Sequence, residues 1–356
     1  MPLRCTDISG NTYLAWKLSK EQWDELRLLN KEQKHLQMPC CGVWAVPKRS
    51  TLGTPYFAHA RKGECASAPE TKEHLLAKMI IAQAVEDSGW NAQTEYRGVT
   101  PEGDCWIADV YAEKGKFKLA FEVQWSRQTL EETKFRQERY AKSGVRCLWL
   151  MKDVPRVISQ SQELPMVPLH VNLTDADASV MIMSYSPYHS SAQGGIKLEN
   201  FIIGVLKHKF QFAPLFGKTV PISLFGRWRK CPGCETWYRS LSIIKFKASE
   251  VLSGLSDFHG DWESFKPDTI MEKALRDAVP LNKLKLGEVR VKYGKKLQQV
   301  CPDCDILIPY ANSGKKEAEL IAEGSLKLPS LTEIQDQGLA DRNTFEWSAM
   351  RWYFLG

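Results

Sequence analysis

The amino-acid sequence predicts an α/β fold whose central unit runs helix, three strands, helix, strand. Apolar residues recur at helical spacing between residues 75 and 85, and Gly89 follows where such a helix would end. Apolar and polar residues alternate strictly over 117–125, which is typical of a strand with one buried face. The run 145–151 is largely apolar, as in a strand that is buried on both faces.

Each element of this unit has its own local signal. The first helix is expected to begin in a capping box formed by Ser67 and Glu70. The second helix is expected between Thr129, which forms a capping box with Glu132, and Ser143. Turns rich in Pro and Gly separate three predicted strands, which cover residues 91–97, 106–112 and 117–125.

The chain has 356 residues, enough for two or three domains, and its 12 Trp, 14 Phe and 11 Tyr exclude disorder for most of it. Four parts are expected along the sequence. They are an N-terminal region with a helix in the second half of 1–36 and a Cys/His knuckle of short strands over 40–65 (1–66), the α/β core (67–152), a linking segment with a helix near 197–210 (153–220), and a C-terminal zinc-ribbon-like domain with a helical insertion over 250–279 (221–356).

The net charge of +6 is distributed unevenly. Residues 205–300 carry 18 Lys/Arg against 9 Asp/Glu, whereas residues from 301 onward carry 5 against 9. A basic segment suits a polyanion such as nucleic acid, although ordinary solvated lysines would give the same balance. The N-terminus has no signal-peptide pattern, and no apolar run approaches the ~20 residues of a membrane helix. We therefore expect a soluble, cytoplasmic protein with no membrane partner.

Two acidic residues fall on one face of the predicted hairpin. A two-residue turn at 114–115 would place Asp109 opposite Ala120 and make Glu122 its diagonal neighbour, about 7–8 Å away. Carboxylates this close repel unless a cation neutralises them, and Mg²⁺ prefers oxygen ligands. Two acids on a hairpin can equally be ordinary surface residues. Glu73 lies at one end of the apolar face of the first helix, where a carboxylate needs a partner.

Three blocks in this order resemble the competence CoiA-like family. They read PYFAHARKGECASAPETKEHLLAKMIIAQ, WIADVYAEKGKFKLAFEVQWS and RQERYAKSGVRCLWL. This family is a branch of the PD-(D/E)XK nuclease superfamily, whose core is an αβββαβ unit like the one predicted above. The resemblance covers about residues 38–151, and its specificity lies in the ordered set of blocks.

The resemblance implies a site for one or two Mg²⁺ or Mn²⁺ ions. Asp109 and Glu122 would be the metal-binding acids, Glu73 the acid of the first helix, and Gln124 would replace the usual lysine. A neutral Gln124 can orient a water but cannot offset charge on the phosphate, so DNA binding without cleavage stays open. Residues that would lie toward the active site and the nucleic acid are His74, Lys78, Arg136 and Tyr140, with ordinary surface placement as the alternative for the last two.

The implied function is that of a metal-dependent DNA endonuclease acting in DNA uptake, recombination or defence against foreign DNA. One alternative is a non-catalytic nucleic-acid-binding accessory protein for recombination, which the neutral Gln124 favours. Another is an RNA-directed nuclease with the same chemistry. Recombination or defence proteins are the expected partners, and a homo-oligomer is compatible with all three interpretations.

Two Cys-x-x-Cys knuckles predict a structural zinc site in the C-terminal domain. Cys231 and Cys234 form one, Cys301 and Cys304 the other, and each has proline after its first cysteine. Redox-active or unpaired thiols are the alternatives. Because 66 residues separate the knuckles, an insertion must lie between them.

Basic and aromatic residues flank the first knuckle. One interpretation is that basic residues contact phosphates and interleaved aromatic residues stack on bases; the basic residues are Arg227, Arg229, Lys230 and Arg239, and the aromatic ones Trp228, Trp237 and Tyr238. Aromatic packing around a small zinc core is the other. In the N-terminal region a second zinc site is predicted from Cys40, Cys41, His59 and Cys65, with His59 as a packed core residue as the alternative.

Overall fold

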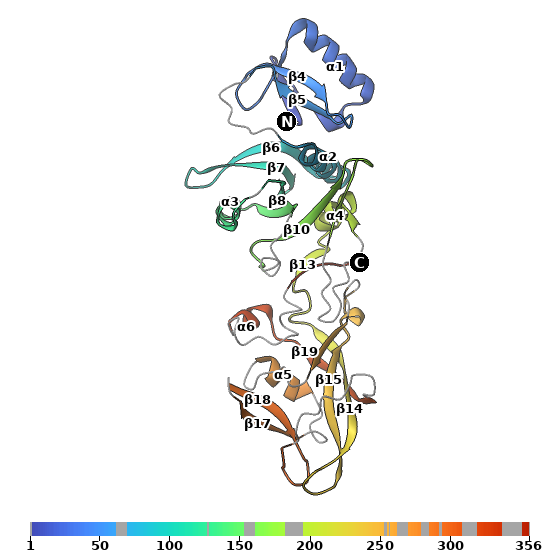
Figure 1. Cartoon of the computed structure of the whole chain (residues 1–356). Helices are drawn as coiled ribbons and strands as arrows, with labels where there is room; N and C mark the ends of the chain where they lie inside the picture. The colour runs from blue at the N-terminus through green and yellow to red at the C-terminus, as the bar shows by residue number, and fades with distance from the viewer. Residues whose placement is uncertain are drawn as a thin grey trace. The chain divides into compact units, whose positions relative to one another are not determined.

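A computed structural model describes most of the chain, which folds into two compact units (Figure 1). The first unit comprises Met1–Met183 and Ala192–His208, and the second Ser184–Ser191 and Lys209–Gly356. Within the described residues, no helix is long and apolar enough to cross a lipid bilayer. The described ranges are 2–61, 70–126, 128–152, 161–181, 195–252, 255, 257–261, 270–278, 285–291, 294–307, 319–336 and 351–355.

The N-terminal region packs a helix against short strands. The helix α1 (Lys20–Gln33) begins at Ser19, whose side chain and that of Gln22 form a capping box. Trp23 of α1 packs against Phe57 at 5.0 Å between ring centroids, and this core extends to Leu75 in the next helix. The predicted helix and knuckle strands are confirmed, whereas the sheet β2-β1-β3 was not predicted. The strands are β1 (Arg4–Asp7), β2 (Thr12–Leu14), β3 (Leu36–Gln37), β4 (Ala45–Arg49) and β5 (Pro55–His59), with a short 3-10 helix η1 (Ala15–Lys17) after β2.

The predicted αβββαβ unit is present. Its elements are α2 (Lys72–Asp87), β6 (Asn91–Val99), β7 (Cys105–Lys114), β8 (Phe117–Gln124), α3 (Leu130–Lys142) and β9 (Arg146–Met151). Strands β6, β7 and β8 are antiparallel, and β9 runs parallel to β8, because α3 carries the chain back across the sheet. The capping box of Thr129 and Glu132 at the start of α3 is confirmed.

The start of the first core helix differs from the prediction. The N-cap of α2 is Thr71, whose hydroxyl accepts a hydrogen bond from the backbone N–H of His74 at 3.3 Å. Glu70 therefore precedes the helix instead of closing a capping box inside it, and Ser67 lies outside the described residues. Thr71 takes the N-cap position because its side chain satisfies a backbone donor that the first turn leaves without a partner.

The register of the β7–β8 hairpin is also corrected. The turn residues are Gly115, at φ +59°, and Lys116, so Tyr111 pairs with Ala120. This register differs by two residues from the predicted one, and a shift of two leaves every side chain on its predicted face. The last pair of this ladder is Val110 with Phe121, so Asp109 and Glu122 are the next residues on the two strands, and the predicted pairing of Asp109 with Ala120 is wrong.

Further strands extend this sheet to seven, in the order β12-β11-β10-β9-β8-β7-β6. The strand β10 (Met166–Asn172) is parallel to β9, and β11 (Asp177–Val180) and β12 (Ile196–Lys197) follow antiparallel to their neighbours. The predicted linking helix is confirmed as the shorter α4 (Leu198–Leu206), which packs on α2. Strands β10 and β11 were not predicted.

The second unit is built on a four-stranded antiparallel sheet, ordered β16-β15-β14-β19. Its core gathers Ile222, Ile244 and Phe246 of this sheet with Met271 of a helix. Within 250–279, where a helical insertion is predicted, the described residues form a helix over Ile270–Ala278 and a strand over Phe258–Asp261. The elements are β13 (Phe210–Phe212), β14 (Thr219–Lys230), β15 (Trp237–Phe246), the 3-10 helix η3 (Ala248–Glu250), β16 (Phe258–Asp261), α5 (Ile270–Ala278), β17 (Lys285–Val291), β18 (Gly294–Val300), β19 (Glu319–Lys327), α6 (Leu331–Asp336) and β20 (Trp352–Phe354).

Candidate functional site

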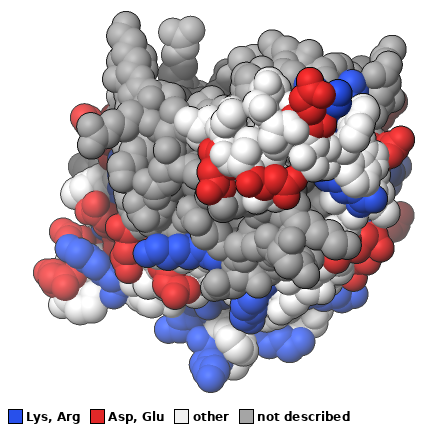
Figure 2. Space-filling view, turned by 90° about the horizontal axis from the view of Figure 1, so that it is seen from below, with Lys and Arg blue, Asp and Glu red and all other residues white. Residues whose placement is uncertain are grey.

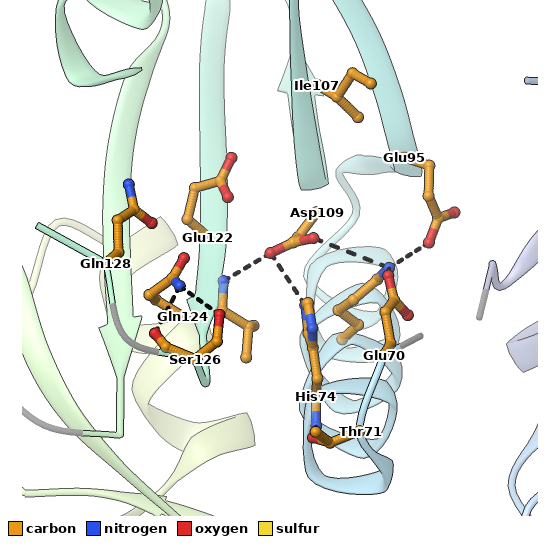
Figure 3. A network of polar contacts seen from close by, with 12 residues as sticks. Glu70, Thr71, His74, Glu95, Ile107, Asp109, Glu122, Gln124, Ser126 and Gln128 are labelled. Carbon is orange, nitrogen blue, oxygen red and sulfur yellow. Dashed lines mark hydrogen bonds and ion pairs between the residues drawn. The ribbon is translucent and has the colours of Figure 1, made fainter. Parts of the chain in front are cut away.

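Asp109 on β7 connects the sheet to α2 (Figure 3). Its Oδ2 atom accepts a hydrogen bond from the backbone N–H of Val123 at 2.9 Å and lies 3.2 Å from Nε2 of His74. Burial opposes ionisation of Asp109, but the neighbouring His74 and Lys78 outweigh it and hold the pKa of this carboxyl well below its usual range. Asp109 is therefore an anion fixed between β8 and α2.

Lys78 is the buried cation of this site, with a side chain that is 0% exposed. Its ammonium is paired with Glu70 at 3.0 Å, with Glu95, and with Asp109 at 4.0 Å (Figure 3). Burial disfavours the charged form, yet Glu95 and Glu70 together hold the pKa of Lys78 above its usual value. We had expected this lysine to lie toward nucleic acid, and the structure places it in the interior among carboxylates instead.

Glu122 on β8 is buried and bound to α3. Its carboxylate accepts a hydrogen bond from the Tyr140 hydroxyl and forms an ion pair with Arg136. Burial and the charge of Asp109 raise the pKa of Glu122 to about 7, against the opposing effect of Arg136. Asp109 and Glu122 thus interact electrostatically across the strands, while their hydrogen bonds lead to different helices.

The two residues of α3 expected on the active-site side are the ones that hold Glu122. The Arg136 guanidinium also lies 4.8 Å from the centre of the Trp149 ring, and the Tyr140 hydroxyl donates to the carbonyl of Ile107 at 3.0 Å. Tyr140 is only 1% exposed. Both side chains are therefore positioned to orient Glu122, and Tyr140 is too buried to contact a phosphate in solvent, whereas the Arg136 side chain is 35% exposed.

Glu70, and not Glu73, is the carboxylate that α2 and its N-terminal approach bring to Asp109. Ligand atoms of Glu70, His74 and Asp109 lie within 4.8 Å of one another. Glu73 is half-buried in the first turn of α2 and does not belong to that group. A sequence signal for the group existed, because Glu70, His74 and Lys78 follow one another at the four-residue spacing of one helical face.

Gln124 ends β8 and binds the segment that follows. Its Nε2 donates to the carbonyl oxygen of Ser126 at 2.8 Å and to the Ser126 hydroxyl at 3.1 Å (Figure 3). The amide at the position of the family's usual lysine is thus fixed by local hydrogen bonds.

A cavity of about 520 Å³ opens beside Asp109. The N-terminal region contributes one part of its wall and strands β6 and β7 another. Its lining includes Arg4, Cys40, Glu70, Glu95, Ile107 and Asp109. Glu70, Glu95 and Asp109 therefore line a space large enough for part of a polymer substrate.

The four knuckle cysteines of the second unit come together. Sγ of Cys231 lies 3.6 Å from that of Cys304, and Sγ of Cys234 lies 3.6 Å from that of Cys301. All four sulfurs lie within 4.8 Å of one another, as a closed tetrahedral Cys₄ zinc site requires. The cluster could hold zinc.

The two knuckles share one backbone geometry. In each, the first cysteine's N–H bonds to the carbonyl five residues on, and its carbonyl accepts from the N–H four residues on. Glu235 and Asp305 occupy the equivalent left-handed position, at φ +61° and +58°. Gly233 lies against the end of the Ile306 side chain, which would have to move to admit a Cβ there. Gln299, just before the second knuckle, joins β18 to β15, just after the first: its side chain donates to the Arg239 carbonyl and accepts from the Leu241 N–H.

Three residues of the predicted N-terminal zinc site also meet. Cys40 Sγ lies 3.6 Å from Cys41 Sγ and 3.2 Å from Nε2 of His59. All three ligand atoms lie within 4.8 Å of one another. The fourth predicted ligand, Cys65, lies outside the described residues.

Residues 70–210 match the family described as "Competence protein CoiA, nuclease-like domain". The match spans every element from α2 to α4 and so contains the whole αβββαβ unit. No curated protein matches the chain. The resemblance to the CoiA-like family inferred from the three sequence blocks is confirmed for this part of the chain.

Proposed function

We propose that this chain, which carries a CoiA nuclease-like domain, is a metal-dependent nuclease that hydrolyses phosphodiester bonds in DNA. The observation that carries the proposal is that Asp109 and Glu122 are the next residues after the last β7–β8 pair, Val110 with Phe121, and interact electrostatically. Glu122 is buried and Asp109 half-buried in the sheet that the family match covers. DNA uptake, recombination and defence against foreign DNA are the processes that the family association suggests.

The donor chemistry of the pair fits Mg²⁺ or Mn²⁺. Carboxylate oxygens are the ligands that hard cations prefer, and the charge of Asp109 disfavours ionisation of Glu122, which a shared cation would relieve. Asp109 and Glu122 would hold the ion, and Glu70 with His74 lies close enough to Asp109 to assist. When bound, such an ion lowers the pKa of a water and polarises a phosphate.

The remaining residues of the site act by positioning. His74 and the Val123 N–H fix the orientation of Asp109, while Tyr140 orients Glu122. Lys78 balances the negative charge of Glu70 and Glu95 and so reduces the electrostatic repulsion among the carboxylates near Asp109. Gln124 would orient a water through its amide, since it has no charge to offer.

A non-catalytic nucleic-acid-binding protein is the second candidate function. Two observations favour it: Gln124 occupies the position of the usual lysine, and Glu122 is already neutralised by Arg136. Binding without cleavage under every metal would then be the result. The same chemistry directed at RNA is a variant of the first candidate, and only the choice of substrate separates them.

The test is cleavage of supercoiled, linear duplex and single-stranded DNA, and of RNA, with Mg²⁺, Mn²⁺ or chelator. Asp109→Ala and Glu122→Ala should each abolish metal-dependent cleavage while the circular dichroism spectrum stays that of the parent. Glu113→Ala is the matched control, because Glu113 lies on the same hairpin opposite Lys118 and outside the acidic group. Full activity of the Glu122→Ala protein would sink the assignment.

We further propose that the Cys₄ cluster binds structural zinc and that Cys40, Cys41 and His59 contribute to a second zinc site. Thiolate sulfur and imidazole nitrogen are the donors zinc takes in structural sites. Hydrogen bonds with Thr236 lower the pKa of Cys234 and so favour its thiolate form.

A further inference from the structure

The tip of the β14–β15 hairpin has two faces of different character. Residues paired across the strands share a face, and Trp228 pairs with Arg239 while Lys230 pairs with Trp237. These four side chains therefore lie on one face, beside the first cysteine knuckle.

The opposite face accounts for the packing around the cysteines. Tyr238 lies there, is 4% exposed, and packs with Cys231 and Cys301 in a small core. Arg229 pairs with Tyr238 and so belongs to that side, as does Arg227 two residues earlier. Tyr238 is thus the aromatic residue that packs around the cysteines, and Trp228 and Trp237 do not belong to that core.

Trp228 and Trp237 are 53% and 61% exposed. Two large aromatic side chains exposed together on one face, where they stabilise no core, are a sign of a binding surface. Trp228 is also held in place, because the Arg239 guanidinium lies 4.9 Å from the centre of its ring and donates to the Ile321 carbonyl at 3.0 Å. A ring fixed before binding loses little entropy on contact.

The charge around this face favours a polyanion. Two cations, Lys230 and Arg239, lie on this face, within a segment (205–300) that carries 18 Lys/Arg against 9 Asp/Glu. Lys and Arg side chains also gather along the lower edge of the view in Figure 2. Lys230 is paired with Glu235 at 2.9 Å, but both are exposed, and an exposed pair contributes little, so a phosphate can compete for the lysine.

We propose that this face, defined by Trp228, Lys230, Trp237 and Arg239, binds single-stranded nucleic acid. Unpaired bases would stack on the two indole rings while the basic side chains contact the backbone. A duplex is the poorer match, since its bases are stacked on one another and present only their edges. The inference rests on the proposed function for the class of polymer and adds its strand form, and it does not depend on cleavage.

The experiment measures binding of the full-length protein to a fluorescently labelled oligothymidylate and to a labelled duplex by anisotropy. Chelator removes divalent metal so that no cleavage occurs, and the Glu122→Ala background gives a second cleavage-free arm. Trp228→Ala and Trp237→Ala should each weaken single-strand binding roughly 5-fold to 150-fold, with Phe at either position restoring most of it. Duplex binding should change less.

Two control variants separate stacking from general loss of apolar surface. Leu320→Ala removes an apolar side chain that is 51% exposed on the neighbouring β19, and Trp44→Ala removes a tryptophan that is 42% exposed in the first unit. Both should bind the oligonucleotide as the parent does. Zinc content and circular dichroism must match the parent in every variant compared.

Parent-like single-strand binding by the Trp228→Ala, Trp237→Ala double variant would overturn the inference. Equal weakening of duplex and single-strand binding would overturn it as well, and so would a double variant that changes only the oligomeric state. Failure of the nuclease proposal has a different signature, namely no cleavage by the parent while tryptophan-dependent binding persists.

Discussion

Arg136 reaches from α3 to form an ion pair with the buried carboxylate of Glu122. A cation at the acidic pair would compete with this guanidinium for the same oxygens. The Arg136–Glu122 ion pair therefore defines the metal-free state of the site, in which Glu122 contacts α3 and Asp109 contacts α2.

Replacement of Arg136 by Met should destabilise the metal-free protein by about 1–3 kcal/mol, because a buried carboxylate loses its counter-charge and the guanidinium is only partly screened by solvent. Mn²⁺ should restore more stability to this variant than it gives to the parent, since the ion takes over the neutralising role. Thermal unfolding with and without Mn²⁺ measures both effects. Lys134→Met, an exposed change on the same helix, is the control, and equal stability of the two variants would contradict the prediction.

The raised pKa of Glu122 predicts a pH dependence of stability in the presence of EDTA. Between about pH 4.5 and pH 7 the folded protein keeps a proton on Glu122 that the unfolded chain has released. The free energy of unfolding should therefore fall as pH rises through this window, by about 3 kcal/mol in total from this group. Glu122→Gln should lack that part of the slope, and urea titrations at a series of pH values test it. Parallel profiles for parent and variant would refute the assignment.

Lys78 stabilises the fold as the counter-charge of three carboxylates. Lys78→Met should lower the free energy of unfolding by about 3–5 kcal/mol, because Glu70, Glu95 and Asp109 would remain near one another without the buried ammonium. Lys72→Met at the exposed start of the same helix should change it by less than about 0.5 kcal/mol. Denaturant unfolding of both variants gives the comparison, and a small effect at Lys78 would be inconsistent with this role.

Glu70 and Glu73 make opposite predictions for activity. If Glu70 assists the acidic pair, Glu70→Gln should reduce metal-dependent cleavage by tenfold or more, on the order of the loss of one electrostatic contact to the reacting groups. Glu73→Gln should leave cleavage near the parental rate, because among the described residues no hydrogen bond or ion pair joins Glu73 to Asp109 or Glu122. Rates at saturating Mg²⁺ decide between them, and the reverse order would return the role to Glu73.

Zinc removal should affect the second unit. Cys301→Ser should reduce bound zinc by one equivalent relative to the parent and lower the unfolding temperature, as structural zinc contributes directly to folding. Cys105→Ser, an exposed cysteine outside both cysteine clusters, should leave zinc content unchanged. Metal analysis with thermal unfolding checks this, and parental zinc content in Cys301→Ser would exclude the site.

Local signals in the sequence predicted the elements that depend on local chemistry. The capping box of Thr129 with Glu132 and the alternation over 117–125 specify α3 and β8 from their own residues. The alternation of side chains along each strand was enough to place Asp109 and Glu122 on one face, and a register error of two residues does not change the face.

Tertiary contacts determined what the sequence left open. The turn of Glu122 toward α3 depends on Tyr140, and the burial of Lys78 depends on Glu95 from β6, neither of which is a sequence neighbour. Strands β17 and β18 pair with each other between the knuckles, in a segment for which the sequence predicts no element. A strand is stabilised by the strand beside it, and the pattern of one segment does not reveal which segment it pairs with.

The Cys₄ cluster also has a topological consequence. A metal ion there would join the two ends of a 66-residue segment that contains β15, β16, α5 and the β17–β18 hairpin. Closing a loop of that length lowers the conformational entropy of the unfolded chain, as a disulfide does. The size of this entropy loss grows only slowly with loop length. Changes in the length of the enclosed segment would therefore leave the geometry of the knuckles, and of the tryptophan-bearing face beside them, largely undisturbed.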